Sequence, residues 1–464
     1  MNQIQWWSVL PFAVLLGCIA SCPLIPGVKK LWHHNAFQLA ISLSLGLPVG
    51  AWMWIAHHHD VIHAMVEYGQ FICLLTALFV VSGGIFVAGD IRAVPRNNVK
   101  FLAIGAVIAS FIGTTGAAML LIRPILNTNK ERRHKVHTIV FAIFIVANCG
   151  GLLTPLGDPP LFLGMLRGVP FLWTMTLIPQ WLLVNGLLLI IYYGLDRKMY
   201  AEESDDAIRW DNTMISPIRI RGGINFLWLG CIVMAVAFAP SIDLHAIHEG
   251  HANANAWLPL RELIMITMIA LSLWTGEKEA RRLNGFEWGP IKEVAALFIG
   301  IFLTMVPALL YLRIIAPSLP LNEISFFCFT GGLSSILDNA PTYVTFFEMA
   351  KEMGGTPSVA GVYVPYLISI SLGAVFCGAM TYIGNGPNFM VKAIADSAGV
   401  EMPTFVGYTI MWAFRNLLPV LIIMVMIFII DDVWVKVLGI VWTMAIVFQA
   451  VYRAYRYQHP SESL

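Results

Sequence analysis

The sequence has few charged residues. Only 12% of its 464 residues are Asp, Glu, Lys or Arg, and 58% are hydrophobic, whereas an average soluble domain is roughly 25% charged and about 45–50% apolar. This scarcity excludes an ordinary soluble enzyme. Apolar runs follow one another instead, and each is long enough to cross roughly 30 Å of hydrocarbon. The chain is therefore expected to be an all-α polytopic membrane protein.

An excess of charge of one sign is also missing, since 28 Lys and Arg residues oppose 27 Asp and Glu residues. We therefore expect no surface for nucleic acid. The seven cysteines lie inside apolar runs without CxxC or Cys–His spacing, which predicts small buried side chains rather than a disulfide or zinc site. No Ser–His or metal constellation appears at membrane depth, so neither an enzyme nor a bound cofactor is expected. The first apolar run lacks the features of a signal peptide and is predicted to be a retained helix.

Eleven apolar segments are predicted to cross the membrane completely. They are residues 7–26, 35–56, 61–88, 136–166, 171–195, 224–241, 259–275, 290–316, 362–395, 404–430 and 437–452. Two further segments, 101–126 and 319–346, are predicted to be re-entrant hairpins, because basic residues flank the first on both sides and favour the cytoplasm. The tip of the first hairpin is expected at residues 113–116. This assignment places most basic residues in the cytoplasm, with the N-terminus outside and the C-terminus inside.

The predicted spans divide into two similar halves. The expected divisions are N-terminal scaffold helices (1–60), repeat 1 (61–195), a cytoplasmic linker (196–223), connecting helices (224–289), repeat 2 (290–430), and a C-terminal helix with a cytoplasmic tail (431–464). Each repeat runs through a helix, a hairpin, a broken helix and another helix. The breaks are expected at residues 150–160 and 378–388.

The two breaks share the pattern T-x-[LI]-G-[DN]-x-P, at residues 154–160 and 381–387. Proline and glycine there interrupt helical hydrogen bonding and free backbone groups. The hairpins enter from opposite sides, so the repeats have inverted topology, which is typical of secondary transporters with a site near the bilayer midplane. Aligning the repeats pairs Asp158 with Asn385, and Asp338 with Thr115 or Gly116.

Oxygen-bearing side chains gather at the hairpin tips and breaks. Asp158 and Asp338 are the candidates for exchanging a proton for a cation, because ionisable groups at membrane depth are costly and usually functional. Each could instead cap the helix that follows it, and the threonines could bond to helical carbonyls. The candidate Na+ ligands are Thr115, Thr154, Asp158, Asp338, Asn339, Thr381 and Asn385. The further candidate binding residues are Thr114, Gly157, Thr342, Gly384 and Asn388.

Two arginines and two groups of histidines lie apart from these motifs. Arg123 is expected to extend to the cytoplasmic surface, whereas Arg415 lies deeper and could serve either a structural or a functional ion pair. The histidines at 57–59 and at 245, 248 and 251 are expected in outside loops. Solvation, metal binding and pH sensing are the alternatives for them.

The break at Gly150 to Pro160 and the hairpin tip at Leu337 to Thr342 resemble the ion transporter superfamily, within its arsenite-permease and NhaD-type Na+/H+ antiporter branch. Sequences of this kind are usually labelled sodium:proton antiporters or citrate-transporter-like proteins, and the resemblance covers about residues 60–430. It implies a homodimer in the bacterial inner membrane, with a scaffold, a mobile transport domain and elevator-type alternating access.

The hairpin tips differ from one group within this superfamily. Its divalent-anion symporters carry Ser-Asn-Thr at both tips, whereas the tips here read Gly-Thr-Thr-Gly and Leu-Asp-Asn. This difference favours a cation substrate. The expected function is Na+ or Li+ exchange for H+. The alternative is Na+- or H+-coupled transport of citrate or another carboxylate anion, and arsenite efflux is weakened by the lack of clustered thiols.

Overall fold

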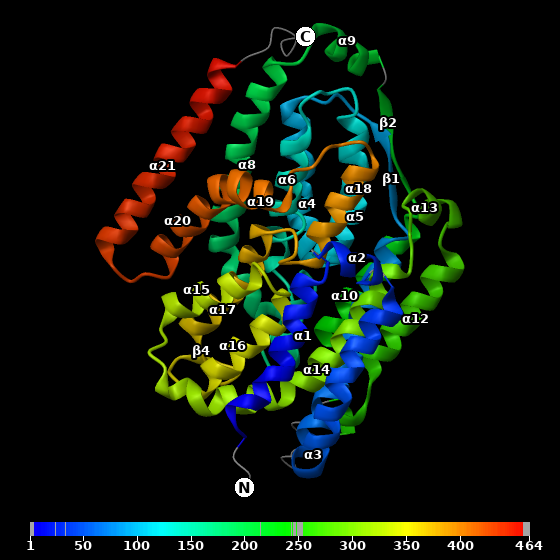
Figure 1. The fold of residues 1–464 in the computed structure, drawn as a ribbon. Coiled ribbons are helices and arrows are strands. Elements are labelled where there is room, and N and C mark those ends of the chain that lie inside the picture. Colours follow the sequence, from blue (N-terminus) through cyan, green and yellow to red (C-terminus); the bar gives the residue numbers. More distant parts are fainter. Residues whose placement is uncertain are drawn as a thin grey trace.

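The computed structural model describes residues 4–457 except 24, 33, 214, 243, 245–246 and 248–253. In this part the chain is almost entirely helical, and most long helices run along the length of the molecule (Figure 1). Among the described residues, five helices are long and apolar enough to cross a membrane, and several shorter helices are apolar as well. The predicted all-α polytopic fold is therefore confirmed. The histidines at 245, 248 and 251 lie outside the described residues.

One group of helices surrounds a central pair, α3 and α14. The group comprises η1 (Trp6–Val9), α1 (Leu10–Ser21), α2 (Pro26–Trp32), α3 (Asn35–Ser82), α10 (Ile224–Phe238), η4 (Ala254–Trp257), α12 (Leu260–Thr275), α13 (Lys278–Leu283) and α14 (Gly289–Ile315). We call these helices the scaffold.

Helix α3 contains two of the predicted crossings. They meet at His57, whose backbone leaves the helical region (φ −135°, ψ 42°). On either side of this point, Ser42 donates a hydrogen bond to the carbonyl oxygen of Leu297, and Phe71 stacks on Phe298 with ring centroids 4.9 Å apart. Because both halves contact the same turn of α14, the chain folds back on itself at His57. The sequence predicted this reversal as a loop, and the structure makes it a sharp kink.

The first repeat continues from α3 through a helix hairpin and a broken helix. Its elements are α4 (Pro95–Ile112), α5 (Thr114–Thr128), α6 (Val136–Ile145), η2 (Cys149–Leu152), α7 (Pro159–Leu166), η3 (Phe171–Leu177) and α8 (Ile178–Ala201). At the base of the hairpin, the Asn98 and Asn129 amides exchange two hydrogen bonds of 2.9 Å. At its tip, Gly113 has a φ of +81°, a conformation that favours glycine. The turn therefore falls within the predicted tip.

The second repeat has the same order of elements after α14. They are η5 (Ala316–Ser318), α15 (Glu323–Ser334), α16 (Asn339–Met353), α17 (Val364–Cys377), η6 (Gly378–Met380), α18 (Gly386–Ser397), α19 (Phe405–Gly407), the π-helical η7 (Tyr408–Leu417) and α20 (Leu418–Phe428). Asn322 and Ser325 start α15 with a capping box, in which each side chain bonds the other residue's backbone N–H. Figure 1 shows the α4–α5 hairpin in the upper half and the α15–α16 hairpin in the lower half, so the hairpins approach the centre from opposite ends.

The polar linker (196–223) contains helical segments and a strand. Its first residues extend α8, and α9 (Asp205–Thr213) follows. Strand β2 (Ser216–Arg221) then pairs antiparallel with β1 (Phe86–Asp90), which the sequence assigned partly to a membrane span. The chain leaves α3 at Ser82 because residues 86–90 find backbone partners in the linker. A second small ribbon joins β3 (Ser358–Val359) and β4 (Val362–Tyr363).

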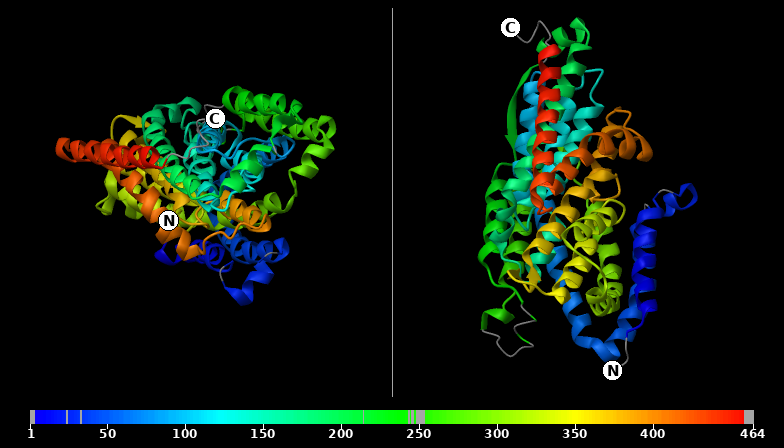
Figure 2. Two further views of the ribbon diagram at one scale, coloured as in Figure 1. Left: turned by 90° about the horizontal axis from the view of Figure 1, so that it is seen from above. Right: turned by 90° about the vertical axis from the view of Figure 1, so that its left-hand side faces the viewer.

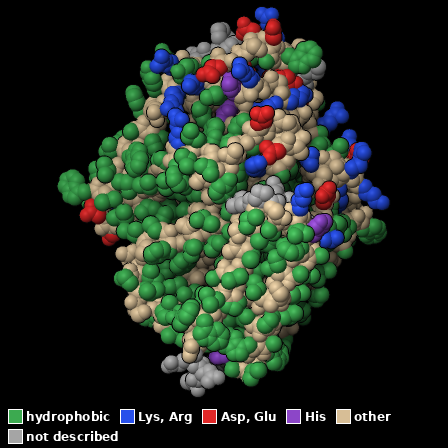
Figure 3. Space-filling view, in the orientation of Figure 1, with side chains coloured by type: hydrophobic (Ala, Val, Ile, Leu, Met, Phe, Trp, Pro, Cys, Tyr) green, Lys and Arg blue, Asp and Glu red, His purple; other side chains and the backbone are tan. Residues whose placement is uncertain are grey.

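The outer surface carries many large apolar side chains. On α21 (Val433–Arg456), Trp434 is 80% exposed and Phe448 is 73% exposed. Figure 2 shows α21 at the edge of the molecule, away from the N-terminal helices. In Figure 3, Lys and Arg gather on the upper half of the visible face, and the lower half is mostly hydrophobic. An apolar surface with basic residues toward one end is typical of a multi-pass membrane protein.

Candidate functional site

Two matching threonines hold the helix breaks against the hairpins. The Thr154 hydroxyl donates to the carbonyl oxygen of Ser110 on α4, and the Thr381 hydroxyl donates to that of Ser335 beside α15. Each hydroxyl also accepts a backbone N–H two residues further along the chain. Both threonines were predicted as Na+ ligands, and in the structure their hydroxyls make these framework hydrogen bonds.

A serine in each repeat also makes a corresponding hydrogen bond. Ser110 donates its hydroxyl to the carbonyl oxygen of Gly150, and Ser335 donates to that of Cys377. Serine and threonine lie 44 residues apart in the first repeat and 46 apart in the second. Because Ser110 and Ser335 each precede a hairpin tip by three residues, the repeats align Gly113 with Asp338. The prediction paired Asp338 with approximately Thr115 or Gly116, whereas these hydrogen bonds place its counterpart two to three residues earlier, at Gly113. The second repeat also has two extra residues between tip and break.

Asp158 lies where the two repeats meet, and only 1% of its side-chain surface is exposed. Its Oδ1 accepts from Thr114 Oγ1 at 3.1 Å and from Asn385 Nδ2 at 3.2 Å. Its Oδ2 accepts from Asn339 Nδ2 at 2.6 Å. The Asp158 side chain makes no capping hydrogen bond to α7, so capping does not explain this aspartate. Both hairpin tips and both helix breaks thus converge on one carboxylate.

Two more buried asparagines support Asn385. Asn148 accepts from Asn385 Nδ2 at 3.2 Å and donates to Asn388 Oδ1 at 2.6 Å. Asn388 in turn donates to the carbonyl oxygens of Gly378 and Thr381. The predicted residue Asn388 therefore closes the second break. Asn148 was missed, although an amide within the apolar run before the first break was a signal for it.

Asp338 occupies a different environment from Asp158. It is half-buried, and its Oδ1 accepts the Ala340 backbone N–H at 3.0 Å, which caps α16. Thr342 donates to the Asp338 carbonyl oxygen within the same helix at 2.9 Å. Both alternatives to direct ion binding, the cap and the helical hydrogen bond, are thus observed here. Asp338 makes no hydrogen bond to Asp158, but it directly precedes Asn339, whose amide donates to Asp158.

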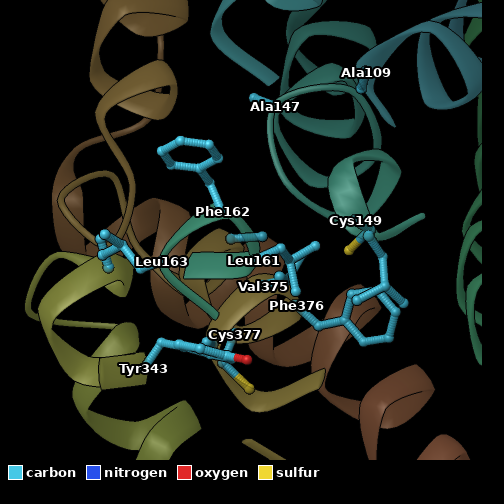
Figure 4. Packing of buried hydrophobic residues seen from close by; sticks show 14 of the residues in the cluster. Ala109, Ala147, Cys149, Leu161, Phe162, Leu163, Tyr343, Val375, Phe376 and Cys377 are labelled. Carbon is cyan, nitrogen blue, oxygen red and sulfur yellow. The ribbon is translucent and has the colours of Figure 1, made fainter. Parts of the chain in front are cut away.

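The glycines of the two motifs bring the backbone segments of each break close together. A side chain at Gly157 would collide with the carbonyl oxygen of Gly151, and one at Gly384 would collide with that of Gly378. Gly157 also accepts the Thr114 backbone N–H at 2.8 Å. Figure 4 shows the apolar packing around these breaks, including Cys149 and Cys377. The predicted residues Gly157 and Gly384 therefore set the backbone geometry of the site.

A cavity of about 80 Å³ adjoins Asp158. Thr114 and Thr115 line it from the first hairpin tip, and α3 and α14 supply mainly apolar side chains from the scaffold. None of the described residues that line it is basic. Next to Asp158, Asn339 Oδ1 is buried without a hydrogen-bond partner among the described residues. An unpaired buried oxygen beside a carboxylate is suited to a small cation or a proton-carrying group.

A second buried polar cluster joins the scaffold to the second hairpin. Arg167, after α7, donates to Glu67 of α3 at 2.8 Å and to Glu348 of α16 at 3.0 Å. Arg313 of α14 donates to the other oxygen of Glu348 at 2.6 Å. The sequence analysis did not predict this cluster. Its members lie too far apart in the chain for spacing to reveal it.

Comparison with known proteins identifies related transporters. Residues 1–429 match the model of the family described as "Putative citrate transport". An uncharacterized transporter of Mycobacterium bovis and one of Mycobacterium tuberculosis are each 25% identical to this chain over 340 residues. The match covers 68% of this chain and 73% of each relative. These similarities support a secondary transporter, and they do not single out the antiporter branch.

Proposed function

The chain belongs to the family described as "Putative citrate transport", and from this premise we propose that it is a secondary transporter that exchanges Na+ or Li+ for H+. The observation that carries the proposal is the convergence of both repeats on the Asp158 carboxylate. A site built around one buried acid, with no basic side chain among the described residues of the adjoining cavity, suits a cation better than a polyanion.

In the proposed mechanism, Asp158 holds either a proton or a cation. A cation would use the carboxylate and the unpaired Asn339 Oδ1, and a proton would neutralise the carboxylate after the cation leaves. Thr115, which lines the cavity, is the further ligand that we assign. Asp338 is the second coupling carboxylate, acting through its charge near Asp158. Because one buried negative charge cannot hold both partners at once, binding of one promotes release of the other.

The proposal includes elevator-type alternating access. The cavity lies between α3 and α14 on one side and the first hairpin tip and first helix break on the other. The hairpins and breaks would move against these scaffold helices and carry the site across the membrane. We also propose that the scaffold forms a homodimer in a bacterial inner membrane, with the N-terminus outside and the C-terminus in the cytoplasm. The basic end of the molecule in Figure 3 and the bacterial relatives support this placement.

Citrate transport is the second candidate function, and the family description favours it. In this version, Asp158 would bind the coupling Na+ or H+, and the freed amides of the breaks would hold carboxylate groups. The lack of basic residues among the described lining of the cavity weighs against a tricarboxylate. Arsenite efflux has no comparable support, since the cysteines that flank the breaks, Cys149 and Cys377, are buried in apolar packing.

The test measures proton movement in everted vesicles from cells that lack their own antiporters. Collapse of a pH gradient is recorded after addition of NaCl, LiCl, KCl and then citrate. We expect a response to Na+ and Li+ that the D158N variant loses. The D431N variant, at a fully exposed aspartate, is the control and keeps the response.

Folding of D158N is checked by its elution and thermal stability in detergent, so that a lost response reports on the carboxylate. Exchange that persists in folded D158N would refute the mechanism. Uptake of labelled citrate without any cation-driven response would replace antiport by the second candidate.

A further inference from the structure

A separate cavity lies between α8, η7 and α21. Its volume is about 280 Å³. Arg415 and Asn416 line it from η7, and Trp442, Gln449 and Arg453 line it from α21. None of these residues belongs to the Asp158 site or to the charged cluster around Arg167. The proposed exchange mechanism therefore leaves this cavity unused.

Two guanidinium groups line this cavity, and none of the described residues that line it carries a carboxylate. Within the part of the chain that the structure describes, neither Arg415 nor Arg453 forms an ion pair. Unpaired charge within apolar helices is costly unless an anion or water meets it. The alternative that Arg415 serves an ion pair within the protein is thus not observed.

The position of the cavity points to a lipid. Arg453 lies in the last turn of α21, beside the exposed Tyr452 and Tyr455, and aromatic and basic residues of this kind are typical of the membrane–water interface. Further along α21, Phe448 and Trp434 face away from the protein. The cavity therefore combines Arg453 at headgroup level and a second guanidinium group at Arg415 with apolar lining residues, among them Ile191, Pro419 and Ile446, along which acyl chains can lie.

We propose that this cavity binds the phosphodiester headgroup of an anionic membrane lipid. Guanidinium groups bind phosphate oxygens through paired, charge-assisted hydrogen bonds. The Gln449 amide can donate to the headgroup, and the Trp442 ring can contact the glycerol and upper acyl chains. A free phosphate has the same anionic chemistry but gains nothing from the apolar wall. Basic pockets between membrane helices recognise lipid headgroups in this way.

The test is native mass spectrometry of the detergent-purified full chain, titrated with phosphatidylglycerol or phosphatidylcholine. We expect phosphatidylglycerol to bind in preference. The double variant R415Q/R453Q should bind it about tenfold more weakly, as loss of charge-assisted contacts predicts. R415K/R453K, which keeps both charges but loses the paired guanidinium hydrogen bonds, should bind more weakly than the wild type and more tightly than R415Q/R453Q. R456Q is the matched control, because Arg456 lies in the same helical turn and does not line the cavity.

Two further arms complete the design. The single variant R453Q should also weaken lipid binding. Because it leaves Arg415 in η7 unchanged, its effect cannot arise from a folding defect in η7. Millimolar inorganic phosphate should leave the lipid bound. Equal binding of both lipids, unchanged binding by folded R415Q/R453Q, or displacement of the lipid by inorganic phosphate would each overturn the proposal.

Discussion

Asp158 and Asp338 occupy unequal positions although both lie near the centre of the molecule. Asp158 receives three side-chain hydrogen bonds and is sealed from solvent. Asp338 is half-buried and receives the Ala340 backbone N–H as a helix cap. A carboxylate that also caps a helix has a structural role that must be separated from any role in coupling.

Substitution of Asp338 by asparagine and by alanine separates these two roles. Asparagine caps helices as well as aspartate does, whereas alanine removes the cap at a cost of about 1 kcal/mol. We expect D338A to unfold at lower temperature than the wild type and D338N to match it. If the charge of Asp338 takes part in coupling, D338N loses cation-driven proton movement despite its wild-type stability. Wild-type exchange by D338N would remove Asp338 from the mechanism and leave Asp158 alone.

At the scale of the elements, Arg167 joins α3 to α16 by two ion pairs. It is 8% exposed, and it pairs with Glu67 and Glu348, which are equally buried. Removal of one partner of a buried ion pair leaves an uncompensated charge, which costs roughly 3–5 kcal/mol. We therefore expect R167M to lower the free energy of unfolding by several kcal/mol, measured by denaturant titration in detergent micelles.

A surface pair provides the control for this prediction. Arg282 is 76% exposed and pairs with Glu279 one helical turn away, and pairs of this kind contribute about 0–1 kcal/mol. R282Q should therefore unfold almost like the wild type. The triple variant E67Q/R167M/E348Q should recover part of the stability lost by R167M, because it removes the carboxylate that R167M leaves buried without Arg167. Arg313, which loses Glu348 in this variant, is one-third exposed and still faces Glu352. A failure of that recovery would mean that packing of Arg167, rather than its charge, is what α3 and α16 require.

Elements formed by local patterns were predictable, and contacts across the chain were not. The apolar runs located the helices, and glycine and proline located the hairpin tip at Gly113 and both breaks. Asp158 could be identified because a carboxylate in an apolar run has a high cost. Its bond to Asn339 joins residues 181 positions apart, and nothing in either local sequence specifies that distance.

The errors in register and in strand assignment have the same origin. The repeats differ by two residues between hairpin and break, so no single offset aligns both elements, and only the long-range serine–threonine hydrogen bonds identify the matching tip residues. Strands β1 and β2 were missed because each satisfies its backbone only by pairing with the other. Asn148 and Arg167 likewise acquire their roles from partners in distant segments.

At the scale of the whole molecule, the orientation of the protein in the membrane determines from which side each hairpin enters. The basic residues favour a cytoplasmic linker and an outside loop between α20 and α21. Single cysteines at Asp205 in the linker and at Asp431 in that loop test this orientation, in a background whose seven native cysteines are replaced. Asp431 is fully exposed and Asp205 begins a surface helix, so both substitutions should be tolerated.

A membrane-impermeant maleimide then distinguishes the two orientations in intact cells. We expect D431C to react from outside, and D205C to react only after the membrane is permeabilised, because basic residues favour the cytoplasmic side. The α4–α5 hairpin, whose base lies toward the linker, would then enter from the cytoplasm and the α15–α16 hairpin from outside. The reverse labelling pattern would exchange these directions. Labelling of both cysteines from one side would contradict the odd number of crossings between them, on which the inverted arrangement of the two repeats depends.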